Sequence, residues 1–558
     1  MEGHLMSHFY DTRGRDRTLY EALTRYNYFP NQKSTICELP PSINSRRFTP
    51  EVAEALAVLP EKKGRHGYDL VEYKATRYNN VPRVLGIVHP KAYAMLAKCI
   101  HDNWHELHFL TLNNNSMIKP EFYHEEKRLM VMNYEDPIVK VTRSHRMGFA
   151  KRFRVQADVT NCFNSIYSHS IPWAALGVAA AKAQKNDKTL WCNKLDEYQR
   201  KTKRNETQGI PIGPATSSIV SELILGCVDR DLRDKGYEFC RYIDDYTCYC
   251  ETDDQAQEFI RTLAASLATY KLSLNLKKTV IDSLPCPVED SWVLELRGAL
   301  PSRLSHAHSE EPKISTTEAL TFLNRAIEVN KSTPDGSVLK YAVSLIFSHL
   351  DETVPLDLID PLLNLAWHFP ALLPFVDLIV QKTPVAIAPY QDQLSAIIKH
   401  NANMGRSDGM AWPLHSMLQA GITVDGETAD HVLNSRDCIA ITLLLEMKIH
   451  EPKIIDLANS LIQSADDYEK DTYWLLFYQL FMRGLINDPY ADGVFDCLKG
   501  FDVNFVPDDK KSKAEMRSDE IFGQIESEAL KHIFEAVLPL KAAQSAIGDE
   551  NEKNLPLF

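Results

Sequence analysis

The sequence predicts a chain of two parts, a mixed α/β or α+β domain followed by an all-α domain of stacked helices. Strand-like and helical segments alternate up to about residue 300, and beyond it nearly all apolar segments read as helices. At 558 residues the chain is too long for one ordinary core. Residues 1–300 hold 41 Lys and Arg against 37 Asp and Glu, a net charge of +4, whereas residues 301–558 hold 21 against 38, a net charge of −17. The two parts therefore have different electrostatic roles.

Composition narrows the class of protein. With 44% hydrophobic and 25% charged residues the chain is globular. It has no apolar run of about 18 residues and its start lacks the apolar core of a signal peptide, so we expect a cytoplasmic protein without a membrane span. The eleven cysteines include no CxxC pair, which favours reduced thiols over disulfides or zinc.

The first 150 residues mix both kinds of element. Helical spacing covers residues 50–59 and 90–107, and extended segments cover residues 81–90 and 128–134. Basic groups gather in this part and just after it, for example in "RSHRMGFAKRFR". A phosphate-binding surface is therefore expected in the first part of the chain, not in the acidic second part.

Residues 151–300 carry strand patterns at "RFRVQADV", "RYIDDYTCYCE" and "WVLELRG", with long amphipathic helices at residues 216–236 and 254–271 between them. A polar stretch near residues 300–315 marks a boundary. Apolar helical segments such as "SVLKYAVSLIFSHL" and "YWLLFYQLFMRGLI" follow, and stacked helix pairs are their natural packing. The predicted domains are residues 1–300 and 301–545, with a loose tail at 546–558.

Two adjacent carboxylates interrupt a strand-like run in "CRYIDDYTCYC", residues 240–250. Strand interiors exclude charge, so Asp244 and Asp245 predict a strand, a two-residue tight turn and a second strand. A purely structural hairpin and a functional one both fit this segment taken alone. A further strand ends at Asp158, and the glycine-rich "GIPIGPATSS" lies between the two acidic sites.

Phosphoryl transfer explains this order of residues. Two Mg²⁺ ions about 4 Å apart activate an attacking 3′-hydroxyl and stabilise the leaving pyrophosphate. Hard cations bind carboxylate oxygens and keep water and substrate phosphates as their other ligands. Asp158 ends a strand and lies beside a hairpin that carries Asp244 and Asp245. This arrangement predicts a site for two Mg²⁺ ions, and we expect Mn²⁺ to be able to replace Mg²⁺ there.

Four motifs in this order resemble reverse transcriptases. "YIDD" is similar to their YxDD signature, "ADVTNCFNSI" to their first palm motif, "GIPIGP" to a motif that usually reads GxPQG, and "LNLKKT" to NxxKT. The resemblance covers about residues 20–290 and implies a right-hand polymerase palm-and-fingers domain followed by a HEAT-like helical-repeat domain.

Roles carried over from this family are expectations for individual residues. The resemblance makes Asp158, Asp244 and Asp245 the catalytic, metal-binding triad. It places Tyr242 near the primer terminus and Phe163 under the sugar, where it excludes a 2′-hydroxyl. The other residues expected to contact the dNTP are Gly209, Pro211, Gly213, Lys278 (with Lys277 as competitor for its role), Arg77 and Arg83.

Ile212 stands where the family usually has Gln. Together with "SIYSHSIPWAALG" and "SEL", this resembles the abortive-infection and defence-associated reverse transcriptases of bacteria, which join a palm to a helical-repeat domain. The resemblance implies a homo-oligomeric antiphage enzyme that makes DNA from dNTPs. The synthesis is either template-independent and protein-primed or copies a non-coding RNA.

Other interpretations stay open at this point. A conventional RNA-templated reverse transcriptase of a mobile element and a catalytically inactive nucleic-acid-binding scaffold share the same motifs. A C-terminal tyrosine such as Tyr468, Tyr473 or Tyr478 is a candidate protein primer, and "YWLLFYQLF" is equally a plain helix core. His145 and His169 are candidates for substrate contact or for structural histidines, and Trp173 is expected to pack.

Overall fold

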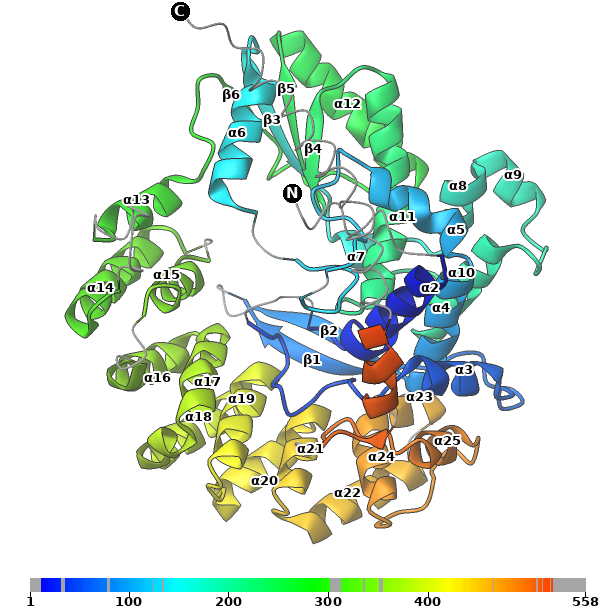
Figure 1. Cartoon of the computed structure of the whole chain (residues 1–558), viewed down its shortest axis with the longest axis vertical. Helices are drawn as coiled ribbons and strands as arrows, with labels where there is room; N and C mark the ends of the chain where they lie inside the picture. Colours follow the sequence, from blue (N-terminus) through cyan, green and yellow to red (C-terminus); the bar gives the residue numbers. More distant parts are fainter. Residues whose placement is uncertain are drawn as a thin grey trace, which may run out of the picture.

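The computed structural model describes residues 12–31, 36–77, 81–123, 125–132, 135–301, 313–334, 337–350, 355–464, 466–507, 510–513, 515–521 and 523–524. The predicted tail at 546–558 and most of the predicted boundary at 300–315 lie outside these ranges. Figure 1 shows the palm sheet at the top, a two-stranded hairpin in the middle, and a curved array of helices below and to the left.

The palm is a four-stranded antiparallel sheet in the order β4-β5-β3-β6. Its strands are β3 (Phe153–Asp158), β4 (Phe239–Tyr242), β5 (Asp245–Cys250) and β6 (Val280–Ser283). Alternation along β3 buries Val155 and Ala157 in the palm core. The helices α11 (Ala215–Asp234) and α12 (Asp253–Thr269) supply much of that core, and α12 packs on β3 and β5.

The fingers hairpin is a separate two-stranded sheet, β1 (Leu70–Thr76) and β2 (Pro82–Val88), paired from Leu70 opposite Val88 to Thr76 opposite Pro82. Helices α2 (Thr12–Glu21), α3 (Pro50–Val58) and α4 (Pro90–Asp102) lie to one side of it in Figure 1. Helix α4 begins where His89 Nδ1 accepts a hydrogen bond from the Lys91 amide and Pro90 occupies the first turn.

Short helices connect the hairpin to the palm and β3 to α11. Their bounds are α5 (Trp104–Leu107), α6 (Pro137–Gly148), α7 (Cys162–Ser165), α8 (Ser170–Leu176), α9 (Val178–Ala183) and α10 (Trp191–Lys201). Helix α10 packs on α4 and α8, and Figure 1 shows α8, α9 and α10 on one side of the palm, whereas α6 lies on the other side and contacts β5.

The second part of the chain is largely helical in its described residues from 313 onward, as predicted. Its helices are α14 (Thr316–Ser332), α15 (Val338–Phe347), α16 (Ile359–His368), α17 (Leu373–Lys382), α18 (Gln391–Met404), α19 (Ser407–Gln419), α20 (Gly426–Ser435), α21 (Cys438–Glu446), α22 (Glu451–Ser464), α23 (Asp467–Asp471), α24 (Trp474–Met482) and α25 (Val494–Gly500). Successive helices pack on one another, for example α14 on α15 and α16 on α17.

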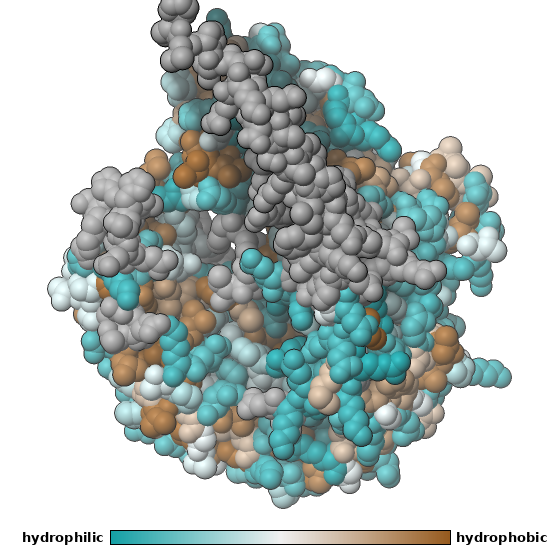
Figure 2. Space-filling view, viewed as in Figure 1, coloured by the Kyte–Doolittle hydropathy of each residue, from teal (hydrophilic) through white to brown (hydrophobic). Residues whose placement is uncertain are grey.

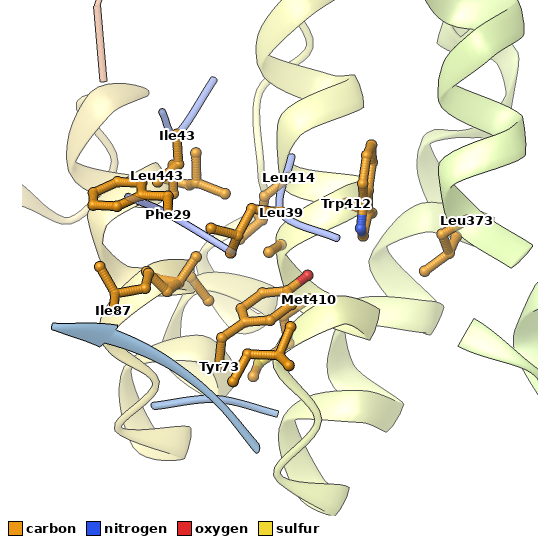
Figure 3. Close-up of a cluster of buried hydrophobic side chains, with 14 of the residues drawn as sticks. Phe29, Leu39, Ile43, Tyr73, Ile87, Leu373, Met410, Trp412, Leu414 and Leu443 are labelled. Carbon is orange, nitrogen blue, oxygen red and sulfur yellow. The ribbon is translucent and has the colours of Figure 1, made fainter. Parts of the chain in front are cut away.

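The fingers hairpin and the helical part share one hydrophobic core. Tyr73 of β1 and Ile87 of β2 lie beside Met410 and Leu414 of α19 and Leu443 of α21 (Figure 3). Polar contacts fasten the same junction: Trp474 Nε1 donates to the Ile87 carbonyl at 3.1 Å. The chain thus runs from fingers to palm to helices and back onto the fingers.

A second set of polar contacts at this junction is buried. The Thr76 hydroxyl donates to Asp408 at 2.8 Å, and the guanidinium of Arg65 pairs with the Asp471 carboxylate. Burial, only partly offset by Arg65, raises the pKa of Asp471 to about 6. These two contacts fix the register between the two parts of the chain, and the buried ion pair adds little net stability.

Two predicted strands are wrong. Residues 292–298 form part of the helix α13 (Ser291–Ala299), because Leu296 packs into the core shared with the helical part while the other side chains remain half-buried or exposed. The described residues of 128–134 form no strand, only an isolated bridge between Tyr123 and Arg128. Strand β1 was absent from the prediction.

Candidate active site

Three carboxylates converge at one end of the palm sheet. Asp158 ends β3, Asp245 begins β5, and the two are direct partners across the antiparallel pair. Asp244 lies in the turn that joins β4 to β5. One carboxylate oxygen from each residue lies within 4.8 Å of the others. The predicted hairpin is therefore present, but its two-residue turn is Ile243-Asp244, one residue earlier than predicted.

The backbone around the carboxylates is fastened from both sides. The Val159 amide donates to the Asp244 carbonyl at 3.2 Å, and the Asn275 amide donates to the Asp158 carbonyl at 2.8 Å. Ile243 occupies the left-handed region at φ +60°, which is unfavourable for a β-branched residue. Such strain persists only where the surroundings enforce the conformation.

Arg241 is the residue that enforces the turn. Its side chain is fully buried, and its Nη1 donates to the Ile243 carbonyl at 2.7 Å. The same guanidinium binds Glu222 at 2.7 and 2.9 Å and Asp229 at 2.7 Å, both from helix α11. The charges of Asp229 and Glu222 outweigh burial and raise the pKa of Arg241, so it stays charged. Arg241 directly precedes "YIDD" but was not among the predicted site residues.

The carboxylates repel one another in the absence of cations. Desolvation by the surrounding protein raises the pKa of Asp245 to about 7, together with the negative charges of Asp244 and Asp158. Burial and the charge of Asp158 likewise raise the pKa of Asp244, opposed by Arg83 and Lys278. Hard oxygen ligands held together against their own repulsion fit a divalent cation.

Lys278 lies at the same site. Its Nζ is 3.2 Å from Asp158 Oδ2, and the Asn275 side chain donates to the same oxygen at 2.9 Å. Burial alone would lower the pKa of Lys278, but the hydrogen bond and charge of Asp158 raise it overall. Lys277, the competing candidate, and Lys278 are both exposed, and it is Lys278 whose Nζ lies beside Asp158. Asn275 lies within "LNLKKT" but was not predicted as a site residue, and its side-chain partner is Asp158.

The two candidate arginines of the fingers differ. Arg83 on β2 is half-buried, its charge acts on Asp244, and its Nε is buried without a hydrogen-bond partner among the described residues. Arg77 follows β1 and is exposed, with its backbone amide bonded to the Val81 carbonyl. The structure therefore brings Arg83, and not Arg77, into electrostatic reach of the carboxylates.

The glycine-rich segment lies between palm and fingers. Gly209 has φ +80°, and its amide donates to the Ile166 carbonyl at 2.8 Å. At Gly213, with φ +130°, an added Cβ would lie 2.4 Å from Pro30 Cβ. Pro211 is buried against Gly86 of β2, and the Gly86 amide donates to the Ile212 carbonyl at 2.8 Å. This loop therefore holds β2 beside the palm.

The aromatic candidates lie next to the carboxylates along the chain. Phe163 is 9% exposed and its carbonyl accepts from the Ile210 amide at 2.9 Å, which joins the first palm motif to the glycine-rich segment. Tyr242 is half-buried, and it is the strand partner of Asp245. Both rings thus border the elements that carry the carboxylates.

Other candidates lie elsewhere. Tyr478 is buried and its hydroxyl donates to the Val503 carbonyl at 2.5 Å, while the Tyr473 hydroxyl donates to the Arg436 carbonyl at 3.1 Å. Tyr468 is half-buried beneath Arg204, whose guanidinium carbon lies 5.4 Å from the ring centroid. His145 is exposed on α6.

A second cluster of possible ligands contains its own cation. Glu54, His101 and Asp102 have ligand atoms within 4.8 Å of one another. Lys98 Nζ lies 2.9 Å from Glu54 and 3.0 Å from Asp102, which neutralises the pair. The palm carboxylates therefore form the better candidate metal centre in the described part of the chain. No helix among the described residues is long and apolar enough to cross a membrane.

Residues 101–312 match the model of a family described as reverse transcriptase (RNA-dependent DNA polymerase). The match includes the three carboxylates, Lys278 and the glycine-rich segment, and excludes Arg77 and Arg83. The chain thus contains a reverse transcriptase domain, which belongs to the nucleotidyltransferases. No curated protein matches the chain.

Solved structures of telomerase from Candida Tropicalis show a distant likeness. The apo enzyme has a TM-score of 0.29 at 12% identity, over 75% of this chain and 69% of that one. The complex with a TWJ fragment of telomeric RNA has a TM-score of 0.28 at 12% identity, over 75% and 65%. The apo enzyme truncated from its C-terminal domain has a TM-score of 0.27 at 12% identity, over 41% and 53%. The chain spans less than two thirds of the length of the last two.

Proposed function

Because the chain contains a reverse transcriptase domain, we propose that the protein is a DNA polymerase of the bacterial defence type that adds deoxynucleotides to a growing 3′-end. The observation that carries the proposal is the convergence of Asp158, Asp244 and Asp245 at one end of the palm sheet. Three carboxylates held together without a cation cost stability, so their retention favours a catalytic role over an inactive scaffold.

Asp158, Asp244 and Asp245 are the residues that would hold two Mg²⁺ ions. Such ions, when bound, would lower the pKa of the primer 3′-hydroxyl and neutralise charge on the transferring phosphoryl group. Lys278 lies 3.2 Å from Asp158 and is placed to bind a phosphate oxygen once Asp158 takes up a cation. Arg83 faces the site from the fingers with a free Nε, and it is the candidate clamp for the triphosphate.

Sugar and base contacts come from neighbouring elements. Phe163 is the candidate floor under the deoxyribose, where its ring would exclude a 2′-hydroxyl. Tyr242 borders the turn that carries Asp244 and is the candidate contact of the primer terminus. Gly209, Pro211 and Gly213 shape the loop between fingers and palm, where a side chain at Gly213 would collide with Pro30.

The defence assignment rests on departures from the ordinary pattern. Ile212 replaces a polar residue, and its half-buried side chain packs against both hydrophobic cores. A helical part that shares its core with the fingers also supports this type. We assign template-independent synthesis as the leading mode, since the polar contact near the incoming nucleotide or template is absent at Ile212. Copying of a non-coding RNA is the second mode.

The decisive experiment incubates the purified protein with Mg²⁺ and labelled dNTPs, without added nucleic acid. We expect labelled DNA in the wild type and none in Asp244→Asn. Sequencing the product and testing whether it stays attached to protein after denaturation separates protein-primed synthesis from copying of a co-purified RNA.

Ribonuclease treatment before the assay provides the control. DNA that still forms supports template-independent synthesis, and DNA that disappears supports an RNA template. Synthesis in Asp244→Asn equal to the wild type would remove the metal assignment. Synthesis only on an added RNA template with an annealed primer would favour a conventional reverse transcriptase.

A further inference from the structure

A cavity of about 530 Å³ lies in the described residues away from the carboxylates, between α8, α9 and α10. None of the residues proposed for the polymerase site lines it. Its volume is in the range of small-ligand sites. These helices lie at the right side of the molecule in Figure 1, where Figure 2 shows hydrophilic residues beside hydrophobic ones.

One wall of the cavity is aromatic. Trp173 is half-buried, its ring meets Tyr167 edge-to-face at 5.6 Å, and Lys182 Nζ lies 5.7 Å from its centroid. Both Trp173 and Lys182 line the cavity, so an aromatic ring and a cation lie together on this wall. Trp173 therefore packs, as expected from the sequence, and also presents a flat surface on which an aromatic base can stack.

His169 adds an oriented polar group to this wall. Its Nδ1 lies 2.7 Å from the buried Asp196 carboxylate, which accepts only, so Nδ1 is the donor. Nε2 is the second polar atom of the ring, suited to hydrogen bonding with a ribose hydroxyl or a base edge. Arg200 also binds Asp196, at 3.3 Å, which fixes the carboxylate between the two.

The lining of the cavity is also rich in lysine. Four lysines line the cavity and form no ion pair among the described residues: Lys182, Lys185, Lys188 and Lys194. The three acidic lining residues are already engaged. Asp187 accepts from the Thr189 amide at 2.8 Å, Asp196 binds His169, and Glu197 binds Lys201 at 2.7 Å. The cavity thus has unbalanced positive charge, which favours an anion.

The loop that carries Lys185 and Lys188 is held in place. The Asn193 side chain of α10 donates to the carbonyls of Gln184 and Asp187 at 2.9 and 2.8 Å. Asp187 also accepts from the Thr189 hydroxyl at 2.6 Å. A fixed loop lowers the entropy lost when the lysines bind a ligand.

We propose that this cavity binds a nucleoside phosphate, with the base on Trp173, the sugar or base edge at His169 and the phosphate among Lys182, Lys185, Lys188 and Lys194. The ligand is either a free nucleotide or one unit of a single strand. The site is distinct from the metal centre and its assignment does not depend on polymerase activity.

The test measures binding by fluorescence anisotropy in EDTA, in the Asp244→Asn background, so that the metal centre contributes nothing. The probes are fluorescein-labelled dT₁₂ and a fluorescent dATP analogue. Binding of dATP alone identifies a free nucleotide, and binding of dT₁₂ identifies a strand; both support the proposal. A matched acidic peptide is the third probe, and binding as tight as that of the nucleic acid would overturn it.

Two sets of variants test the lysines and Trp173. We expect Lys185→Ala/Lys188→Ala and Trp173→Ala each to weaken binding about tenfold or more. Trp173→Phe should restore most of the affinity, which also shows that the helices still fold. The charge-matched control Lys331→Ala/Lys382→Ala, on α14 and α17, should leave binding unchanged. Equal affinity in the cavity variants and this control, or no binding of either nucleic-acid probe, would overturn the site.

Discussion

Asp158 and Asp245 are direct partners across the antiparallel pair of β3 and β5, although they are 87 positions apart in the chain. Side chains opposite each other on one face lie about 5 Å apart. Like charges in that position destabilise a sheet. The pairing therefore lowers the folding stability of the sheet at the position where the carboxylates can bind a cation.

Replacing these carboxylates should separate stability from activity. We expect Asp158→Asn and Asp244→Asn to reduce dNTP incorporation by about a thousandfold or more, since each removes a ligand that contributes several kcal/mol to transition-state stabilisation. The control Asp253→Asn changes an exposed carboxylate in the first turn of α12 and should keep wild-type activity. Incorporation is measured under single-turnover conditions.

Asp245→Asn should not lower the melting temperature of the ion-free protein. The folded-state pKa of Asp245 is raised to about 7, so its ionised form at neutral pH opposes folding, and a neutral isostere removes that cost. Thermal unfolding in EDTA at pH 7.5 measures this. A clear drop in melting temperature would mean that the carboxylate is a structural ligand of the fold.

Metal binding should depend on pH. The raised pKa of Asp245 means that stability from its protonated form is present at low pH and is lost as pH rises through about 7. Protons compete with Mg²⁺, so we expect about tenfold weaker Mg²⁺ binding at pH 6 than at pH 8, with proton release on binding. Calorimetry in buffers of different ionisation enthalpy measures both. Equal affinity at the two pH values would contradict the assignment.

Phe163→Ala should relax sugar selection. Without the ring, a 2′-hydroxyl meets no wall, and we expect the preference for dNTPs over rNTPs to fall by about tenfold or more. The measurement is the ratio of kcat/KM for dATP and ATP. The control Phe149→Ala alters a side chain that is 83% exposed and should leave that ratio unchanged. An unchanged ratio in Phe163→Ala would move the gate to another residue.

Arg241→Met should cost about 3–5 kcal/mol of stability, because it leaves Glu222 and Asp229 buried without their partner. The triple variant Arg241→Met/Glu222→Gln/Asp229→Asn should recover most of the lost stability. It should not recover activity, since nothing then holds the Ile243 carbonyl and the turn that carries Asp244. Recovery of both would show that Arg241 serves folding alone.

The three carboxylates of the candidate active site could be predicted from the sequence, because strand alternation and a charged turn are local patterns. "RFRVQADV" and "YIDDYTCYC" placed all three carboxylates, with an error of one residue in the turn. The error has a physical cause, since the turn begins at Ile243, a residue that no turn rule favours, and Arg241 holds it there. The partners of Arg241 lie on a helix earlier in the chain.

Short apolar windows were harder to assign. "WVLELRG" alternates like a strand yet forms α13, because seven residues do not distinguish the two periods when a single leucine, Leu296, supplies the buried contact. The core shared by Tyr73 and Ile87 with α19 and α21 joins segments more than 300 residues apart. Pairing at such separation leaves no trace in local periodicity.

The common interior of the fingers and the helices has a consequence for how the enzyme can be divided and controlled. Strand β2 presents Arg83 to the catalytic end and, at Ile87, accepts a hydrogen bond from Trp474. Truncation after the palm would expose the apolar face of β2 that packs on the helices. We therefore expect that a fragment holding only fingers and palm does not fold on its own. A ligand that shifts α24 would also move β2 and Arg83, and would thereby change the proposed binding of the nucleotide by Arg83.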